Sequence, residues 1–438
     1  MIKNKKVGML TLGCKVNQYE SEAIAEALAA FGITAAEPDA DCDAFIVNTC
    51  TVTAEADRKS RQMIRRLHAA NPSAPIIVTG CTAQSAPQKI AEIDGVRAVC
   101  GNAEKLRCAS LASELIEEKE LKKPSIYVPD IRSAPFEKMS LRSFPRTRVY
   151  IKIEDGCENR CAYCAIPAAR GSVRSKHPED VLREVSEFVA DGCPEIVLTG
   201  IETASYGRDL DGVTLADLLC RVDEICDKTR IRLGSIYPTL LDEEFVGKIS
   251  RLKHIAPHFH ISLQSGSTKT LAAMNRRYTA EEAAAAMARL RAAMPDVMFT
   301  TDVIVGFPSE SEKEYAETRE FLEKNRFLTA HIFPYSPREG TPAASMPDQV
   351  SQEDKKRRAA DLAALQEQIT REILTAEIEK APVRRVLFET FSNGKATGHT
   401  DSFIEVIAQS DADIKGKEVC VKLLRVEKST IIGEIIKK

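Results

Sequence analysis

Residues Ile76–Cys81 read "IIVTGC", an apolar run that ends in a glycine and a thiol. The same order of apolar strand, small or polar turn and cysteine occurs at Val7–Cys14, "VGMLTLGC", and at Phe45–Cys50, "FIVNTC". Cysteine is common in protein cores, but burial alone does not explain a repeated position at strand ends. Helical periodicity follows each cysteine, and alternating strands and helices predict a parallel sheet. Ligands of such sheets bind at the carboxyl ends of the strands, where all three cysteines are expected.

The first of these helices shows an amphipathic pattern. We expect Ile24, Leu28 and Phe31 on its buried face and Gly32 as its C-terminal cap. The N-terminal segment is therefore predicted to be an α/β domain.

Composition limits the class of protein. The chain has 438 residues, 44% of them apolar, and a formal net charge of -3. Its length predicts about two to four domains, and its charge gives no general attraction to nucleic acid, so any RNA-binding surface must be local. Thirteen cysteines in so long a chain do not suggest a disulfide scaffold, and reduced thiols favour a cytoplasmic protein.

The N-terminus, "MIKNKKVGMLTLGC", imitates the start of a secretion signal. Its apolar stretch is shorter than the roughly 7 to 15 residues of a signal core. No later stretch approaches the roughly 20 apolar residues of a membrane span. We therefore expect no membrane association.

The rest of the chain divides by pattern. Residues 118–145 lack periodicity, contain four prolines and are predicted to be a linker between residues 1–117 and residues 146–376. The second region contains six strand candidates with helical patterns between most of them, which predict an open or partial (β/α)6 barrel. These candidates are Val149–Glu154, Glu195–Thr199, Arg230–Ile236, His258–Leu263, Val297–Val305 and Thr329–Tyr335. A charged helix over Gln352–Lys380 follows, and short strands in residues 377–438 predict a small antiparallel β-barrel.

The stretch "DGCENRCAYC" places Cys157, Cys161 and Cys164 directly after the first strand of the predicted barrel. A structural zinc site needs four protein ligands, and no fourth Cys or His lies at a matching distance. A cubane iron–sulfur cluster held by three thiolates leaves one iron free to chelate a small molecule. The spacing favours a cluster, and a zinc-binding RNA module without catalysis stays as an alternative.

This motif resembles that of the radical S-adenosylmethionine enzymes. Other stretches extend the resemblance to the methylthiotransferases over nearly the whole chain: "LGCKVNQYESE", "VNTCTVT", "VTGC", "HISLQSGSTKTLAAMNRRYT", "TDVIVGFPSESEKEY" and "FPYSPREGTPAASMPDQV". "GCKVNQYES" is similar to the subfamily that acts on N6-threonylcarbamoyladenosine at position 37 of tRNA. The last segment, through "TGHTDSFIEV", resembles the RNA-binding TRAM domain.

The resemblance implies S-adenosylmethionine and two [4Fe-4S] clusters as cofactors. Cys157, Cys161 and Cys164 would hold the cluster that cleaves S-adenosylmethionine to a 5′-deoxyadenosyl radical. Residues Cys14, Cys50 and Cys81 would hold the second cluster, where sulfur chemistry occurs. The other cysteines are expected to be structural: Cys42, Cys100, Cys108, Cys193, Cys220, Cys226 and Cys420.

The same resemblance suggests where S-adenosylmethionine is bound. Backbone near Gly200 and the carboxylate of Glu202 would face its amino group. The ribose would lie near Gln264 and Ser265, and the adenine near Val305 and Gly306. Tyr237 stands where many relatives have Glu, and no catalytic residue beyond the cluster ligands is assigned.

The expected function is methylthiolation at C2 of the modified adenosine, with isopentenyladenosine-37 of tRNA or a ribosomal protein as alternative substrates. The expected partners are the anticodon stem-loop of tRNA, an electron donor protein and a sulfur donor. A basic run after Cys50 could hold phosphates, at Arg58, Lys59, Arg61, Arg65 and Arg66. In the last barrel the candidate base-stacking residues are Phe391, His399 and Phe403.

Overall fold

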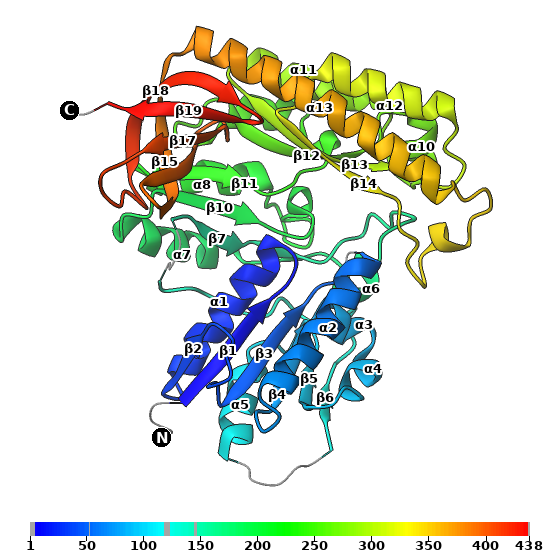
Figure 1. Cartoon of the computed structure of the whole chain (residues 1–438), viewed down its shortest axis with the longest axis vertical. Coiled ribbons are helices and arrows are strands. Elements are labelled where there is room, and N and C mark those ends of the chain that lie inside the picture. The colour runs from blue at the N-terminus through cyan, green and yellow to red at the C-terminus, as the bar shows by residue number, and fades with distance from the viewer. Residues whose placement is uncertain (1–4, 52, 118–122, 144–146, 437–438) are drawn as a thin grey trace.

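The computed structural model describes residues 5–51, 53–117, 123–143 and 147–436. The N-terminal domain contains a parallel sheet in the order β2-β1-β3-β4-β5-β6. Its strands are β1 (Lys5–Thr11), β2 (Ile33–Ala36), β3 (Ala44–Thr49), β4 (Ile76–Gly80), β5 (Val96–Cys100) and β6 (Ser125–Tyr127). Figure 1 shows this domain below the rest of the molecule.

Helices cover both faces of this sheet, and each face has its own apolar core. One core includes side chains of α1 (Lys15–Ala29) and α5 (Arg107–Glu117). The other includes side chains of α2 (Ala54–Ala70), α3 (Cys81–Ser85) and α4 (Pro87–Ala91). The predicted parallel α/β domain is confirmed.

Two local predictions in this domain were wrong. Helix α1 ends at Ala29, so Phe31 lies beyond it and is 37% exposed, because the chain turns at Gly32 with a φ of +73°. Residues 125–127 of the predicted linker form strand β6, whose backbone pairs with β5 at the sheet edge. Residues 118–122 and 144–145 of that linker lie outside the described residues.

The central domain contains all six predicted strands. They are β7 (Val149–Lys152), β10 (Glu195–Thr199), β11 (Arg230–Leu233), β12 (His258–Gln264), β13 (Met298–Val305) and β14 (Thr329–Pro334). They form two three-stranded parallel sheets, β11-β10-β7 and β12-β13-β14, which isolated parallel bridges from Ile231 to Ile255 and from Ile236 to Ile261 connect. The predicted partial barrel is confirmed as an open arc.

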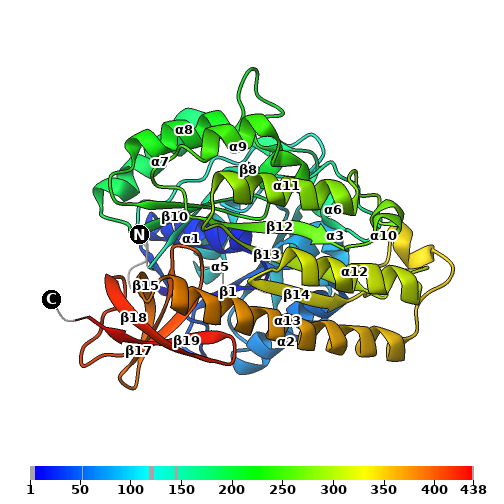
Figure 2. The ribbon, with the colours of Figure 1, turned by 90° about the horizontal axis from the view of Figure 1, so that it is seen from above.

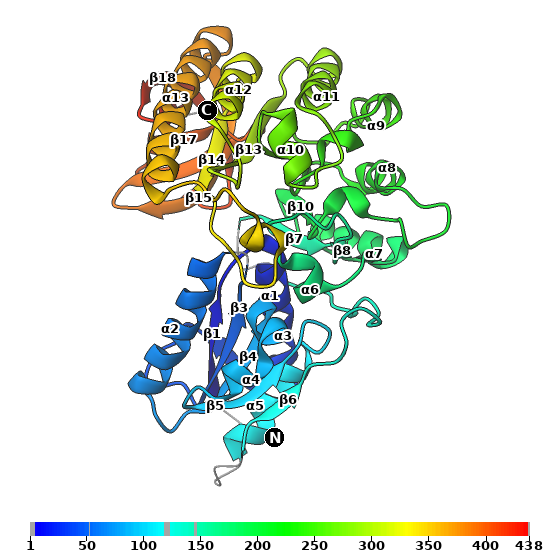
Figure 3. The same cartoon turned by 90° about the vertical axis from the view of Figure 1, so that its right-hand side faces the viewer.

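Helices and a short hairpin complete this domain. The hairpin pairs β8 (Glu154–Asp155) with β9 (Arg174–Ser175). The helices are α6 (Ile166–Arg170), α7 (Pro178–Ala190), α8 (Leu215–Ile225), α9 (Glu243–Ile249), α10 (Thr268–Ala273), α11 (Ala280–Ala293) and α12 (Glu312–Asn325). In Figure 3, α7 to α9, α11 and α12 lie along the outer side of the arc.

Helix α13 (Gln352–Lys380) has the bounds that the sequence predicts. It packs along β14 and leads into the C-terminal barrel, as Figure 2 shows. Among the described residues, no helix combines the length and the apolarity that a membrane crossing requires.

The C-terminal barrel is closed in the order β15-β16-β17-β19-β18. Its strands are β15 (Val383–Ser392), β16 (Lys395–Thr400), β17 (Glu405–Gln409), β18 (Glu418–Glu427) and β19 (Thr430–Ile435). The prediction of an antiparallel barrel holds except for β17 and β19, which pair parallel. A closed ring with an odd number of strands cannot alternate in direction all the way round, so at least one pair must be parallel.

The expected base-stacking residues of this barrel are used inside the protein. The Phe403 ring stacks between His258 and His399, with ring centroids 4.5 and 4.6 Å away. The guanidinium groups of Arg232 and Arg148 lie 4.9 and 5.4 Å from the Phe403 centroid. Phe403 therefore fastens the barrel to the central domain, and His399 packs against the Phe403 ring from within the barrel, instead of presenting a free stacking surface. Phe391 packs against the core of the barrel.

Candidate active site

Three cysteines lie at one edge of the N-terminal sheet. Cys14 is the N-cap residue of α1, Cys50 follows β3, and Cys81 begins α3 directly after β4. Because β1, β3 and β4 are neighbours, their carboxyl ends place these residues together, as expected. Gly13 allows this approach: its φ is +102°, and a Cβ there would lie 2.8 Å from the Sγ atom of Cys50.

The other three cysteines share the loop between β8 and α6. The loop is held by a hydrogen bond from the Cys157 N–H to the Gly171 carbonyl oxygen at 3.0 Å. A tight turn joins the Cys164 N–H to the Cys161 carbonyl oxygen at 3.0 Å. Burial is the main reason that the pKa of Cys157 is raised to about 12 and that of Cys164 to about 11, and the neighbouring cysteine charges contribute to both shifts. The loop thus concentrates three sulfur donors in surroundings with little water.

The donor set fits an iron–sulfur cluster. In the described part of the chain, no three His, Cys, Asp or Glu side chains converge on the position of one metal ion. Ligands of a cubane cluster stand farther apart, because each thiolate binds its own iron. The role of these six cysteines as ligands stays a prediction.

The two cysteine sets face each other across the domain boundary. Helix α6, which begins just after Cys164, packs against α3, which begins with Cys81, and Figure 3 shows the two helices side by side. The charge of Cys81 is close enough to raise the pKa of Cys164. Both sets therefore open towards the same region between the domains.

A buried arginine donates to one sulfur of each set. Arg170 Nε lies 3.3 Å from Cys81 Sγ, and Arg276 Nη1 lies 3.4 Å from Cys161 Sγ. The sequence analysis missed both arginines, because their motifs contain several arginines and nothing in the pattern indicates which one is buried. Arg276 also explains the tyrosine at position 237: its guanidinium lies over the Tyr237 ring, 4.2 Å from the centroid.

Two carboxyl groups at the end of β10 suit a cationic ligand. Glu202 is 8% exposed, and its Oε2 accepts a hydrogen bond from Asn159 Nδ2 at 3.1 Å. Glu154 is fully buried, and a Cβ at Gly200 would lie 2.5 Å from its Oε2 atom. Each carboxyl group keeps one buried oxygen, Oε1, without a hydrogen-bond partner in the protein. Burial raises the pKa of Glu202 to about 7 and that of Glu154 well above its ordinary value. The ammonium group of S-adenosylmethionine would fit these unpaired oxygens; Glu154 was not predicted.

The other predicted contacts of S-adenosylmethionine are less well placed. The Ser265 hydroxyl is fully buried and lies 3.1 Å from Thr318 Oγ1 of α12. The Val305 carbonyl accepts a hydrogen bond from the Tyr335 N–H, and the Gly306 N–H donates to Glu310. Gln264 ends β12 with a φ of +73° and is half-buried.

Strands β12 to β14 carry a group of polar and aromatic side chains that the sequence analysis did not single out. His260 Nε2 lies 3.2 Å from Asp302 Oδ2, and the ring of His331 stacks 6.3 Å from that of His260. The side chain of Phe333, two residues along β14, is 46% exposed. Such a surface offers hydrogen bonds and an apolar face to a planar, polar ligand.

Comparison with known proteins gives a consistent result along the chain. Residues 6–101 match the Uncharacterized protein family UPF0004, and residues 151–322 match the Radical SAM superfamily. The chain is 39% identical to the threonylcarbamoyladenosine tRNA methylthiotransferase MtaB of Bacillus subtilis, over 96% of this chain and 94% of that protein. The MtaB protein of Thermotoga maritima is 40% identical over 81% of this chain and 80% of its own.

Another relative is named for a different nucleoside. The tRNA-2-methylthio-N(6)-dimethylallyladenosine synthase of Syntrophobacter fumaroxidans is 35% identical, over 97% of this chain and 94% of its own. Among solved structures, the radical S-adenosylmethionine methyltransferase TsrM from Kitasatospora setae is similar with a TM-score of 0.57 and 15% identity. The match covers 78% of this chain and 77% of that one. At such identity the likeness shows the fold alone.

Proposed function

The chain belongs to the radical S-adenosylmethionine tRNA methylthiotransferases, and on this basis we propose that it places a methylthio group on C2 of N6-threonylcarbamoyladenosine at position 37 of tRNA. Membership brings a [4Fe-4S] cluster and S-adenosylmethionine. The observation that carries the proposal is the presence of two three-cysteine sets, one in each domain, which face the same region.

The residues of the chain divide the work between two places. When bound, the cofactors supply a 5′-deoxyadenosyl radical and a methyl group at the barrel, and a sulfur atom at the N-terminal edge. Cys157, Cys161 and Cys164 would hold the first cluster, and Cys14, Cys50 and Cys81 the second. Residues 1–117 thus provide the second cluster site, residues 146–376 the radical chemistry and residues 377–438 part of the RNA surface.

The carboxyl groups near β10 would orient S-adenosylmethionine. Glu202 and Glu154 each have an unpaired buried oxygen that can accept from an ammonium group. Gly200 leaves room beside Glu154 because it has no side chain. On the other side of the arc, His260, Asp302 and the exposed Phe333 offer a surface for the adenine base and its substituent.

The anticodon stem-loop would approach along the basic helix α2. Two of its arginines are already paired, Arg58 with Glu55 and Arg61 with Asp57. The side chains of Lys59, Arg65 and Arg66 are exposed and could contact phosphates. The proposal also includes an electron donor protein, a sulfur donor and a location in the cytoplasm, where thiols stay reduced.

Mass spectrometry of nucleosides tests the proposed substrate. Anaerobically reconstituted enzyme is incubated with S-adenosylmethionine, a reductant and tRNA that carries either threonylcarbamoyladenosine or isopentenyladenosine at position 37. We expect a methylthio product from the first tRNA only. The Syntrophobacter relative serves as the reference enzyme for the second tRNA. Product from isopentenyladenosine alone would contradict the substrate, and product from neither tRNA, with a ribosomal protein modified instead, would contradict the action on tRNA.

A further inference from the structure

Arg170 lies in a buried network of polar groups between the two domains. Its Nη1 atom contacts Glu20 Oε1 at 2.5 Å and Asp155 Oδ2 at 3.2 Å. Its Nη2 atom donates to Asn17 Oδ1 at 2.6 Å, and its Nε donates to Cys81 Sγ at 3.3 Å. The guanidinium therefore joins two carboxylates, an amide and a thiol of the proposed second cluster site.

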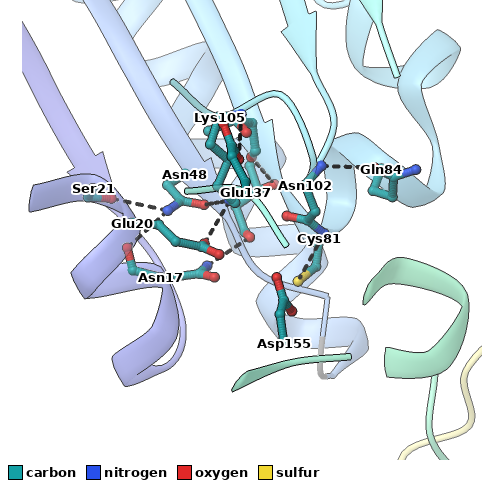
Figure 4. Close-up of polar contacts among 12 residues, drawn as sticks. Asn17, Glu20, Ser21, Asn48, Cys81, Gln84, Asn102, Lys105, Glu137 and Asp155 are labelled. Carbon is teal, nitrogen blue, oxygen red and sulfur yellow. Dashed lines mark hydrogen bonds and ion pairs between the residues drawn. The ribbon is translucent and has the colours of Figure 1, made fainter. Parts of the chain in front are cut away.

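The network is assembled from both domains. Glu20 and Lys105 come from the N-terminal domain, and their side chains lie 2.8 Å apart. Lys152 and Asp155 come from the central domain; Lys152 Nζ lies 2.8 Å from Glu20 and 2.6 Å from Asp155. Figure 4 shows Glu20 pointing from α1 towards Lys105. Asp155 and Cys81 lie beside each other in the same view, below Lys105.

The charges of this network do not balance. Lys105, Lys152 and Arg170 are at most 1% exposed and carry three positive charges, whereas Glu20 and Asp155 carry two negative ones. The nearby Arg174, 3.4 Å from Asp155, adds to the positive side. The Glu137 carboxylate, which accepts from the backbone N–H groups of Lys105 and Leu106, adds a third negative charge, so four cations face three carboxylates. A buried charge without a partner is costly, so the network favours one more anion.

The sulfur of Cys81 stands where that anion is needed. It is 3% exposed, and besides Arg170 only the amide of Asn102, at 3.9 Å, donates to it among the described residues. A thiolate is formed when a cysteine binds iron. Together with the three carboxylates of Glu20, Asp155 and Glu137, the Cys81 thiolate would match the four cations.

We propose that Arg170 is a positioning residue of the second cluster site: it fixes the Cys81 thiolate, raises the reduction potential of the cluster, and links cluster binding to the packing of the two domains. This inference rests on the second cluster of the proposed function. Hydrogen bonds to ligand sulfurs and nearby positive charge favour the reduced cluster, because reduction adds negative charge. The helix that carries Arg170 starts two residues after Cys164, so one short segment touches both cluster sites.

The experiment uses the full chain with Cys157, Cys161 and Cys164 replaced by Ala, so that only the second cluster can bind. In this background R170Q and R170K are compared with R174Q, which removes a cation beside Asp155 that does not touch Cys81. A further variant, R170Q with E20Q, removes one positive and one negative charge. It tests whether the effect of R170Q comes only from the change in net charge of the network. Iron content and the midpoint potential from an EPR-monitored titration are measured for each.

We expect R170Q to keep the cluster but to lower its potential. A tenfold loss in the equilibrium constant for reduction corresponds to about 59 mV for a one-electron couple. R170K should lie between the background protein and R170Q, and R174Q should lower the potential less than R170Q does, because Arg174 does not donate to Cys81. R170Q with E20Q should keep the lowered potential. Hydrogen exchange in α6 should slow when the cluster is loaded into the background protein, and should not slow in R170Q.

Two results would overturn the inference in different ways. An unchanged potential in R170Q at full iron content would show that Arg170 has only a structural role, while the second cluster stands. A background protein that is folded but holds no iron would overturn the second cluster itself and, with it, this role of Arg170.

Discussion

In each cysteine set a buried arginine donates a hydrogen bond to one sulfur, but carboxylates surround one arginine and tyrosine rings surround the other. Arg170 reaches Cys81 from the other domain and is surrounded by the carboxylates of Glu20 and Asp155. Arg276 reaches Cys161 from within its own domain and lies against the rings of Tyr237 and Tyr278, 4.2 and 5.3 Å from their centroids. Among the described residues, no carboxylate forms an ion pair with Arg276.

The difference concerns how much positive charge each set of sulfurs experiences. Carboxylates neutralise most of the charge of Arg170, so its effect on Cys81 comes mainly from the hydrogen bond. Tyrosine rings attract a cation but do not cancel its charge. We therefore infer that the barrel site depends more strongly on its arginine than the N-terminal site does, and the following experiments examine that comparison in order of decreasing effect.

The largest effect should come from removing each cysteine set. The triple change of Cys14, Cys50 and Cys81 to Ala should leave cleavage of S-adenosylmethionine to 5′-deoxyadenosine intact and reduce methylthio product to background. Iron should fall from about eight to about four per chain, since each cubane holds four. Chromatography of both products and iron analysis measure this, with Cys220→Ala as the control. Methylthio product at the wild-type level would contradict the assignment of sulfur insertion to the N-terminal cysteines.

The second effect concerns Arg276 alone. Arg276→Gln removes the donor to Cys161, and a hydrogen bond that involves a charged group contributes about 1.5–3 kcal/mol. Formation of 5′-deoxyadenosine should therefore slow about 10- to 100-fold, and the potential of the barrel cluster should fall further than that of the second cluster does in R170Q. The exposed neighbour change Arg277→Gln is the matched control. Equal shifts at the two sites would contradict the comparison.

A third effect concerns pH at the binding site of S-adenosylmethionine. Glu202 has a pKa of about 7, raised mainly by burial, so it is largely protonated below that pH and charged above it. A cationic ammonium prefers the charged form, and affinity should therefore increase as pH rises from about 6 to about 7.5, below the pKa of about 8 at which an α-ammonium group itself loses its proton. Glu202→Gln should bind about tenfold more weakly and lose this dependence, because a lost charge-assisted hydrogen bond costs about 1.5 kcal/mol or more. Isothermal titration measures both, with exposed Glu158→Gln as control; a pH dependence that survives in Glu202→Gln would assign it to another group.

The smallest effect should come from Tyr278→Phe. The ring stays, but its hydroxyl no longer accepts from Arg276 Nε at 3.1 Å or donates to the Leu263 carbonyl. The hydroxyl does not touch Cys161, and Arg276 keeps its own hydrogen bond to that sulfur, so only part of the arginine's effect should be lost. We expect 5′-deoxyadenosine formation to slow about fivefold, which corresponds to about 1 kcal/mol. Single-turnover rates measure this change. A loss as large as that of Arg276→Gln would show that the tyrosine, not the arginine, sets the environment of Cys161.

The sequence predicted features that depend on local pattern. Strand ends with a cysteine, such as those at Cys50 and Cys81, follow from an apolar run and the residue after it. The bounds of α13 follow from an uninterrupted helical pattern. The six barrel strands were found for the same reason.

Features that depend on distant contacts could not be predicted in this way. Arg170 meets Cys81 only because two domains pack together, and the partner of the Ser265 hydroxyl, Thr318, lies 53 residues later on α12. Phe403 is an aromatic residue of the kind that stacks on RNA bases, yet it packs between His258 and His399. Strand β6 has only three residues, too few to show a period, and it exists because the edge of β5 is available.

The cross-domain network also has a consequence for synthesis on the ribosome. Glu20 is made early, but its partners Lys152 and Arg170 are added well over a hundred residues later. Domains generally fold as units while the chain emerges, N-terminal part first. Here Glu20 of the N-terminal domain would lack its partners Lys152 and Arg170 until the segment after Cys164 has left the exit tunnel. If the cysteines of the N-terminal domain bind the second cluster as proposed, the nascent domain would have an interval in which chaperones and the machinery that loads iron could still reach them.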